Sequence, residues 1–432
     1  MTTRTMGGCG RAAATILAAA CGALGAPAHA GNGLNLIGFG AESIGMGGAD
    51  IALGREVSGI NINPAGLSQI PSRRLDAYAL PFFGYNMRHE DALNERSRMD
   101  NPWGLILGGG YAWRARPDLV AGVGVFAQGG NGIQYEKLQT VFGTRDEATA
   151  IFGATKLVGG LAWQPDPRWA LGANLGLTYS MGRQKLFPET SAPGDPDTST
   201  PPFFGLRFDG GAGFSLNGRV GILHKPSPNF TWGFTYASPT KLKLEDGTLT
   251  VNYEAIGLPA TKYRDAKITG FELPQEVGAG FAWRFQPLWL FAMDVMFLDW
   301  SGSIKSTRVI ASDPTIDGAP ADVDLSVPLD YRDQVVLALG LAIDVTPRTT
   351  VRFGANISRN PAPAATMQPT GNLIERWEVD AGFTHRFDES WELAMGLQYQ
   401  PPDSIAYDSP LFDDAKEHYG VTALTIQLSR HW

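Results

Sequence analysis

Residues 31–72, GNGLNLIGFGAESIGMGGADIALGREVSGININPAGLSQIPS, form the segment that decides the fold. The segment is rich in glycine and other small residues, and its apolar residues follow neither a helical nor a strand period. Glycine adopts positive φ angles without strain and lets other groups approach closely. The glycines Gly45, Gly47 and Gly48 therefore predict a compact irregular coil that packs against another part of the chain.

The same segment ends in a predicted turn at Asn63-Pro64-Ala65-Gly66. Pro64 fixes its own φ and keeps the preceding Asn63 out of the helical region. After residue 72 the sequence changes, and an alternating, aromatic-rich pattern continues to the last residue. The contrast predicts a plug formed by residues 31–72 inside a wall formed by residues 73–432.

The wall sequence alternates with a period of two. Between residues 169 and 179 apolar residues occupy most odd positions and small or polar residues the even ones, and the pattern returns in residues 335–345 and 391–399. This period predicts strands with one apolar face and one small or polar face. Aromatic residues at both ends of the apolar face, such as Trp169 and Tyr179, are typical of the two interfaces of a membrane barrel.

Short turns and long loops alternate along the wall. Six Pro- or Asp-rich turns lie at residues 116–118, 165–167, 226–229, 286–287, 346–348 and 388–390. Long polar loops lie at residues 89–101, 129–151, 185–204, 245–266, 306–329, 361–372 and 401–416. The six turns join twelve strands, and the strands before the first loop and at the chain end (about residues 73–87 and 419–432) raise the count to fourteen. This layout predicts an all-β, 14-stranded antiparallel transmembrane β-barrel.

The first thirty residues predict a cleaved signal peptide. They combine arginines near the start, an apolar run at residues 12–24 that is too short to cross a bilayer, and an A-x-A cleavage site at residues 28–30. A lipoprotein signal ending at Cys21 is the alternative. The second cysteine, Cys9, also lies here, so the rest of the chain has neither disulfides nor thiolate metal sites.

The charge balance excludes one large class of partners. Without residues 1–30 the chain has 33 basic and 43 acidic residues, a net charge of −10. This balance argues against nucleic acid, since binding a phosphate backbone requires a basic surface. No later segment has the about 20 consecutive apolar residues of a transmembrane helix. A mean hydropathy of −0.10 with 11 Trp and 22 Phe is typical of a membrane barrel.

A barrel of fourteen strands needs something to fill its bore. Eight strands leave an interior that side chains fill, whereas sixteen to eighteen leave an aqueous channel. The inward residues here are mostly Gly, Ala, Ser and Thr, so we expect residues 31–72 to close the bore. Four inward charges are expected to pair with the plug, pair with each other or remain hydrated: Asp294, Asp344, Arg352 and Glu392.

The sequence predicts no catalytic, metal or cofactor site, and we expect that the protein is not an enzyme. The histidines after residue 30, at positions 89, 224, 385, 418 and 431, lack metal-ligand spacing. A G-x-S-x-G motif fails because Gly40 is one residue too far from Ser43. Acidic pairs at 322/324 and 413/414 suit either a calcium site or a solvated loop surface.

Several motifs resemble the FadL-type outer-membrane transporters. The run Ser43-Ile44-Gly45-Met46-Gly47-Gly48-Ala49, followed by Asn63-Pro64-Ala65-Gly66-Leu67, is similar to the N-terminal hatch of that family. Softer matches are WGFTYASP at 232–239, LPQEVG at 273–278 and DWS at 299–301. The resemblance spans nearly the whole chain after residue 30. It implies an outer-membrane barrel with a hatch that carries long-chain fatty acids or aromatic hydrocarbons.

Two sets of apolar residues are the candidate substrate contacts. Leu34, Leu36, Ile37 and Phe39 precede the glycine cluster, and in a plug they would line a pocket inside the bore, where the resemblance also implies a substrate site. Two long loops carry apolar residues that either serve a partner or pack against each other. These are Phe203, Phe204 and Leu206 in one loop, and Ile256 and Leu258 in the other. The resemblance implies that both loops form an outer, low-affinity groove.

The resemblance also implies that the substrate leaves sideways, through a gap at an inward kink in the third strand. That strand is about residues 119–128, where Gly122 and Gly124 permit a kink. The candidate gating residues are these two glycines together with Gly45, Gly47, Gly48, Asn63, Pro64 and Gly66. We therefore expect passive uptake of hydrophobic small molecules by a monomer in contact with outer-membrane lipid. The C-terminal strand is expected to be recognised by the outer-membrane assembly machinery.

Two other functions remain open from the sequence. One is a structural or adhesin-like barrel whose plug never moves, and the other is a porin for polar solutes. A porin predicts ion conductance in planar bilayers, whereas a transporter predicts almost none. An adhesin predicts that deletion of residues 34–39 leaves function intact.

Overall fold

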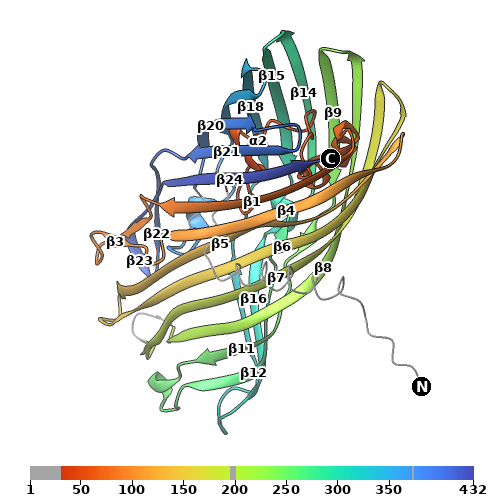
Figure 1. The fold of residues 1–432 in the computed structure, drawn as a ribbon. Helices are drawn as coiled ribbons and strands as arrows, with labels where there is room; N and C mark the ends of the chain where they lie inside the picture. The colour runs from red at the N-terminus through yellow and green to blue at the C-terminus, as the bar shows by residue number, and fades with distance from the viewer. Residues whose placement is uncertain (1–30, 195–200, 372–373) are drawn as a thin grey trace, which may run out of the picture.

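The computed structural model describes residues 31–194, 201–371 and 374–432, so the predicted signal peptide lies outside the described residues. Fourteen antiparallel strands close into a barrel, because β1 pairs with β4 on one side and with β24 on the other (Figure 1). This confirms the predicted fold class and strand count. The strands are β1 (Arg73–Gly84), β4 (Trp103–Arg116), β5 (Leu119–Gln139), β6 (Arg145–Asp166), β7 (Trp169–Ala192), β8 (Phe203–Ser227), β9 (Phe230–Ala237), β14 (Glu276–Gln286), β15 (Trp289–Leu298), β18 (Gln334–Thr346), β19 (Thr349–Ile357), β20 (Trp377–Arg386), β21 (Trp391–Tyr399) and β24 (Val421–His431).

The period of two in the sequence separates side chains that face the bore from side chains on the outer surface of the barrel. Large apolar side chains point outward and stay exposed on the barrel surface, for example Leu175 at 64% and Leu216 at 67%, whereas their strand neighbours are more buried. A contiguous exposed apolar surface marks contact with another apolar phase. Arg430, a charge among apolar residues of β24, lies 4.6 Å from the Trp432 ring centroid in a cation–π contact.

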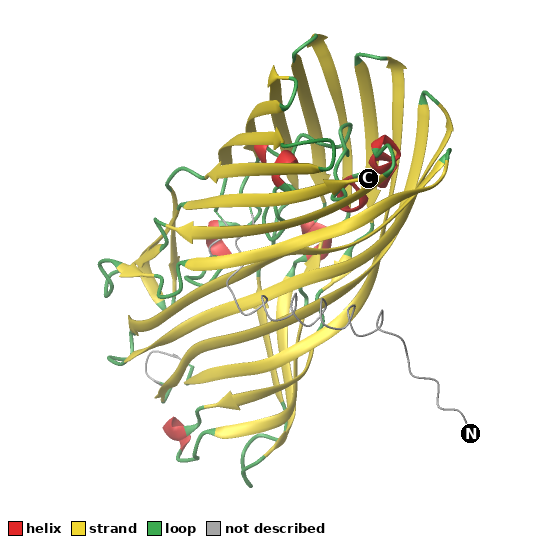
Figure 2. Cartoon of the chain, in the orientation of Figure 1, coloured by secondary structure: helices red, strands yellow, loops and turns green. Residues whose placement is uncertain are grey.

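Several predicted loops are strands, and those expectations were wrong. β5, β6, β7 and β8 continue far past the other wall strands, and β11 (Leu244–Val251), β12 (Thr261–Thr269), β16 (Ser306–Pro314) and β17 (Val323–Pro328) extend this sheet (Figure 2). A second sheet holds β2 (Arg88–Glu90), β3 (Ser97–Arg98), β22 (Asp403–Ser409) and β23 (Phe412–Tyr419). The segments between the wall strands also contain a short strand pair and three short helices. These are β10 (Thr240–Lys241) with β13 (Glu272–Leu273), η3 (Glu254–Ile256), α4 (Trp300–Ser303) and η4 (Ala364–Thr366). Polar composition was a poor guide because hairpins beyond the bilayer need no apolar face.

The hatch, residues 31–72, is more regular than the predicted coil. It contains α2 (Ala41–Gly45), α3 (Gly59–Ile62) and η2 (Pro64–Gln69). The Asn63 side chain accepts a hydrogen bond from Ala65 N at 3.1 Å, and Asn63 has an extended backbone, as its position before Pro64 requires. The predicted turn is therefore the capped start of a 3₁₀ helix.

Wall side chains hold the hatch backbone from many sides of the bore. Asp294 on β15 accepts hydrogen bonds from Asp50 N and Ile51 N at 2.7 and 2.8 Å. Similar bonds come from Asp76, Arg219, Thr235, Asn356 and Gln427, which belong to β1, β8, β9, β19 and β24. The hatch therefore spans the bore and satisfies its own backbone groups through the wall, as a buried irregular segment must.

Small residues on both sides permit this close contact. Gly47 has a φ of +66°, and a Cβ on it would lie 2.6 Å from the backbone of Ala355 in β19. Two of the four predicted inward charges contact the hatch, and the other two pair with residues of the wall. Asp294 and Arg352 contact the hatch, the latter through Glu42 at 3.4 Å. Asp344 and Glu392 pair with wall residues Arg284 and Arg74 at 3.0 and 3.2 Å.

Among the residues that the structure describes, no helix has both the length and the apolar character needed to cross a membrane.

Candidate ligand cavity and wall opening

The ladder between β4 and β5 covers only part of β4 and leaves the first residues of β4 unpaired with β5. The two strands pair from Arg116 and Leu119 up to Gly108 and Phe126, while β4 continues to Trp103 with β1 as its partner in the described structure. β5 turns away there, with a register shift against β6 between Ala127 and Gly129. Further on, Asp100 N donates to Gln134 O at 2.9 Å, which rejoins the two segments. The wall is thus interrupted beside residues 103–107.

The start of the hatch occupies the inner side of this interruption. Asn35 forms a β-bridge with Gly129, Leu36 N donates to Gln128 O at 3.3 Å, and Gly130 N donates to Leu34 O at 3.1 Å. A Cβ on Gly129 would lie 1.7 Å from Leu34 O, so a glycine is required at this position. Hatch residues 34–36 therefore take the place of a neighbouring strand for β5.

The two glycines at which the sequence permitted a kink lie outside the interruption of the wall. Gly122 and Gly124 stay in register with Ala112 and Gly110 of β4. The departure of β5 from β4 occurs past them, at Gln128. Local sequence did not distinguish these positions, because glycines also occur at 129 and 130.

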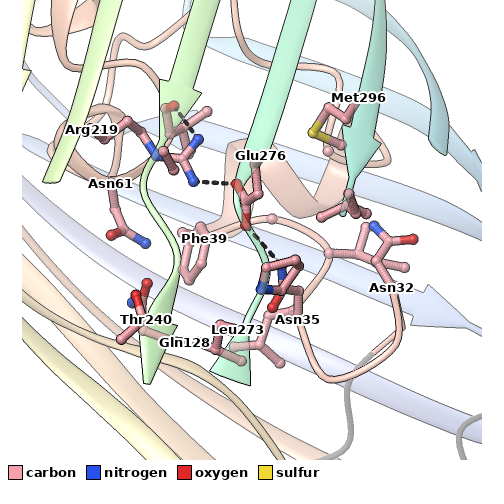
Figure 3. A pocket seen from close by; sticks show the side chains of 18 of the residues that line it. Asn32, Asn35, Phe39, Asn61, Gln128, Arg219, Thr240, Leu273, Glu276 and Met296 are labelled. Atoms are coloured by element: carbon pink, nitrogen blue, oxygen red, sulfur yellow. Dashed lines mark hydrogen bonds and ion pairs between the residues drawn. The ribbon is translucent and has the colours of Figure 1, made fainter. Parts of the chain in front are cut away.

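A cavity of about 80 Å³ lies behind the interruption, between the hatch and the walls around it (Figure 3). Three of the four predicted hatch residues line it: Leu36, Ile37 and Phe39. Phe39 packs edge-to-face on Phe126, with ring centroids 6.1 Å apart. We call this space the inner cavity.

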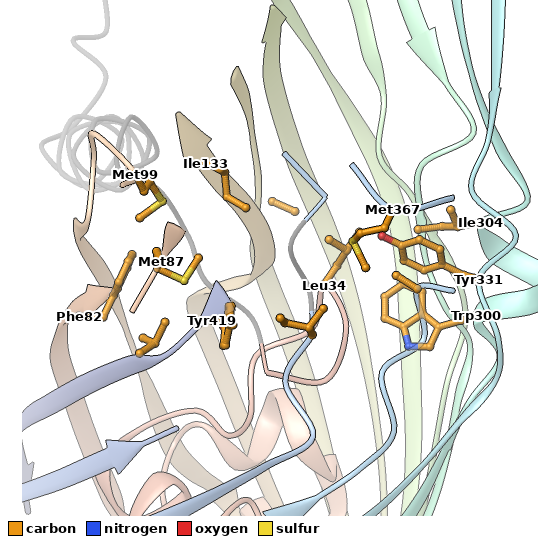
Figure 4. Packing of buried hydrophobic residues seen from close by; sticks show 14 of the residues in the cluster. Leu34, Phe82, Met87, Met99, Ile133, Trp300, Ile304, Tyr331, Met367 and Tyr419 are labelled. Atoms are coloured by element: carbon orange, nitrogen blue, oxygen red, sulfur yellow. The ribbon is translucent and has the colours of Figure 1, made fainter. Parts of the chain in front are cut away.

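The remaining predicted hatch residue, Leu34, does not line the inner cavity. It is 1% exposed and packs within an apolar cluster above the hatch that includes Phe82, Trp300 and Tyr331 (Figure 4). Gly33 fits here because a Cβ on it would lie 2.7 Å from the Trp300 ring. Leu34 therefore ties the hatch to the loops above it.

Polar groups occupy one side of the inner cavity. Arg219 on β8 donates to Ile62 O at 3.0 Å and forms an ion pair with Glu276 on β14, and Asn35 Nδ2 donates to Glu276 Oε1 at 2.7 Å (Figure 3). Lys156 on β6 also lines the cavity and is 3% exposed. Within the described ranges its ammonium group makes neither a hydrogen bond nor an ion pair with another side chain. A buried ammonium without a partner is costly and suits an anionic ligand.

Sequence reasoning missed these polar residues, although strand parity contained the signal. On β6 the outward residues are Leu157, Leu161 and Trp163, so the even-numbered Lys156 faces the bore. On β8 the outward Leu216 and Val220 place the odd-numbered Arg219 inside by the same rule.

A larger apolar pocket of about 440 Å³ lies among the extended hairpins and loops. We call it the outer pocket. Of the five predicted loop residues, Leu206 lines it. Phe203 stacks on Phe142, Phe204 packs edge-to-face on Tyr253, Leu258 packs on the same small core, and Ile256 is 52% exposed. Most of these residues therefore pack against neighbouring side chains of the hairpins and loops.

The other predicted gating residues lie where the hatch meets the wall or crosses itself. A Cβ on Gly45 would lie 2.8 Å from Gly382 Cα, and one on Gly66 would lie 2.7 Å from Gly54 Cα. A Cβ on Gly48 would lie 3.4 Å from Ile37 Cγ2, and Asn63 Nδ2 donates to Ile51 O at 2.8 Å. Pro64 lies against Gly172 of β7. These contacts position the hatch, and their role in opening stays a prediction.

A buried histidine organises the small sheet beside the outer pocket. His89 on β2 is 0% exposed, and its ring nitrogens contact Glu417 at 2.5 Å and Asp91 at 2.8 Å. Its ring packs edge-to-face on Phe412, which lines the outer pocket. Burial alone would lower the pKa of His89, but the hydrogen bonds and charges of Asp91 and Glu417 outweigh it and raise the pKa to about 9.

We expect this sheet to loosen as the pH rises. A raised histidine pKa stabilises the fold fully below about pH 6.5, and the contribution, up to about 3 kcal/mol, is lost as the pH passes 9. Hydrogen exchange of β2 and β23, corrected for intrinsic rates, should therefore speed up between pH 6.5 and 9.5. A His89→Phe variant should lack this pH dependence, and an equal response in both proteins would contradict the assignment.

Comparisons with known proteins agree with this geometry. The family model described as "Outer membrane protein transport protein (OMPP1/FadL/TodX)" matches residues 7–409. The search of curated proteins found no match. Among solved structures, the Ralstonia pickettii toluene transporter TbuX is 18% identical with a TM-score of 0.73, covering 92% of this chain and 99% of that one. The Pseudomonas putida toluene transporter TodX is 16% identical with a TM-score of 0.77, covering 93% and 100%.

A Pseudomonas aeruginosa FadL homologue is similar at 14% identity and a TM-score of 0.69, covering 93% of this chain and 99% of that chain. At these identities the solved structures establish the shared fold. The family model matches nearly the whole chain and therefore establishes the family as well as the fold. The chain is an outer-membrane β-barrel that belongs to the OMPP1/FadL/TodX family of outer membrane transport proteins.

Proposed function

We propose that this protein takes up hydrophobic molecules with an anionic head group, such as long-chain fatty acids, passively across the outer membrane. The observation that carries the proposal is the inner cavity, where Leu36, Ile37 and Phe39 adjoin the unpaired Lys156. Apolar and cationic walls together match an amphipathic anion. A hydrocarbon without a head group would leave the Lys156 side chain without an ion-pair partner.

The two spaces suggest an order of events. The outer pocket has the size typical of small-molecule sites, about 300–1,000 Å³, and its lining is mainly apolar. The inner cavity, about 80 Å³, is too small for a whole fatty acid. A ligand would thus bind first in the outer pocket, and its passage inward would displace the start of the hatch.

The exit that we propose is lateral, through the interruption between β4 and β5. Hatch residues 34–36 cover it, and Leu36 also lines the inner cavity, so displacing them would join cavity and wall. An apolar ligand leaving sideways enters a phase that solvates its chain, whereas an exit along the bore would meet the hatch and water. We further propose that the protein is a monomer in contact with outer-membrane lipid, whose last strand, β24, is recognised during assembly.

Replacing Lys156 by Met should test the head-group assignment. A charge-assisted hydrogen bond contributes about 1.5–3 kcal/mol, so the dissociation constant of a long-chain fatty acid should rise about 10- to 100-fold. The dissociation constant of the matching fatty alcohol should stay nearly unchanged. Tryptophan fluorescence or calorimetry on the purified barrel measures both, and Lys156→Arg is the charge-keeping control. Equal losses for acid and alcohol would contradict the assignment.

The alternatives give different results in simple assays. A porin would conduct ions steadily in planar bilayers, whereas the hatch-filled barrel should conduct almost none. An adhesin-like barrel would keep its function after deletion of residues 34–39. Uptake that depends on these residues, without steady conductance, supports the transport proposal.

A further inference from the structure

A group of buried carboxylates lies beside the first residue of the hatch. Glu375, just before β20, and Glu378 and Asp380, on β20, are 4%, 0% and 6% exposed. Both carboxylate oxygens of Glu375 and of Asp380 are buried without a donor among the described residues. The side-chain amides of Gln398 and Gln400 donate to Glu378 at 3.3–3.4 Å. In the described part of the chain no basic side chain forms an ion pair with the three carboxylates, although buried charge requires a counter-charge.

Gly31 contacts this group directly. A Cβ placed on Gly31 would lie 2.6 Å from Oε2 of Glu375. The Gly31 nitrogen is bonded to the same Cα at about 1.46 Å, so it is near the carboxylate too. At present the nitrogen donates one hydrogen bond, to Asn35 O at 3.1 Å. A small cavity of about 30 Å³ borders Gly31, Gln398 and Gln400. The buried Oε1 of Gln400 lacks a donor within the described structure.

We propose that cleavage after Ala30 completes this site: the new α-ammonium group of Gly31 binds the Glu375 carboxylate and supplies the positive charge that the carboxylates of Glu375, Glu378 and Asp380 lack. Hydrolysis adds water across the Ala30–Gly31 peptide bond. It leaves a carboxylate on Ala30 and an amine on Gly31, which takes a proton to become the ammonium. The inference rests on the cleavage position predicted from residues 28–30, and it does not depend on which ligand the barrel transports.

The chemistry of the ammonium matches what the site lacks. An uncleaved chain offers one neutral N–H, whereas an ammonium offers three donors and a positive charge. One donor keeps the bond to Asn35 O, and the other two are available for the Glu375 carboxylate and Gln400 Oε1. Removal of the signal peptide thereby supplies the missing counter-charge and fixes the turn at residues 31–35, directly before the residues that cover the wall opening.

Chemical labelling of the α-amine tests this site in the processed protein from outer membranes. Mass spectrometry first establishes that the chain begins at Gly31. An amine-reactive reagent at pH 7 should then label Gly31 at least about tenfold more slowly in the folded than in the urea-unfolded protein, because only the free amine reacts and one pKa unit changes its fraction tenfold. The Glu375→Gln/Glu378→Gln/Asp380→Asn variant should label nearly as fast as the unfolded chain. Glu389→Gln, an exposed charge removal in a turn, is the matched control.

Each other outcome overturns the proposal. Slow labelling that persists in the triple variant shows that burial alone protects the amine. Labelling of the native protein at the unfolded rate shows a free terminus, and a stoichiometric metal ion in the purified protein shows that the carboxylates hold a cation instead. A first residue other than Gly31 removes the basis of the site. If the triple variant fails to fold, as judged by heat-modifiable electrophoretic mobility, the single Glu375→Gln variant is compared, and its labelling midpoint must fall to lower pH.

Discussion

A disulfide between the hatch and the third barrel strand should abolish uptake, and reductant should restore it. The pair Leu36→Cys and Gln128→Cys suits this test, because Leu36 N bonds to Gln128 O at 3.3 Å and both residues line the inner cavity. Residues opposite each other in an antiparallel ladder have Cβ atoms about 4.5–5.5 Å apart, close to disulfide geometry. No cysteine occurs after residue 30, so the pair has no competing partner.

The effect should be large because the disulfide prevents residues 34–36 from moving away from β5, which the proposed lateral route requires. With residues 34–36 fixed to β5, the inner cavity stays separate from the wall opening. Uptake of a radiolabelled fatty acid should fall to that of cells without the protein, and each single-cysteine variant should retain it. Undiminished uptake with the disulfide fully formed would show that ligands leave by another path.

Replacing Asp294 by Ala should loosen the hatch in the bore and open the barrel to polar solutes. The Asp294 carboxylate is 1% exposed and accepts the N–H groups of Asp50 and Ile51, which the variant leaves without acceptors. Each buried donor left unpaired costs about 1–3 kcal/mol. Even about 2 kcal/mol in total raises the population of a displaced hatch about 30-fold.

Planar-bilayer recordings would detect this change as conductance steps that the native barrel lacks. Asp294→Asn is the matched control, because its amide oxygen still accepts both bonds and should keep the barrel closed. Silent recordings from a correctly folded Asp294→Ala barrel would show that the remaining contacts hold the hatch without this anchor.

The sequence was sufficient for the barrel because its determinants are local. Turn residues and the period of two predicted fourteen strands and their facing. The same parity would also have placed Lys156 and Arg219 inside the bore, but it was not applied to them. The long hairpins were hidden because polar strands beyond the bilayer have no apolar face to reveal them. The departure of β5 at Gln128 was also hidden. Its position depends on docking of residues 34–36, more than ninety positions away in the sequence, and the predicted strand ended at residue 128, which left Gly129 in a predicted loop.

The backbone bonds between residues 34–36 and β5 suggest how a passive barrel resets itself after each passage. When the start of the hatch moves away, the exposed peptide groups of β5 face a cavity with few substitutes, and each unmet group is unfavourable by about 1–3 kcal/mol. That deficit acts as a restoring force toward the sealed arrangement once the ligand has gone. If ligands leave by the proposed lateral route, strand pairing with β5 would return residues 34–36 to the sealed position after each passage.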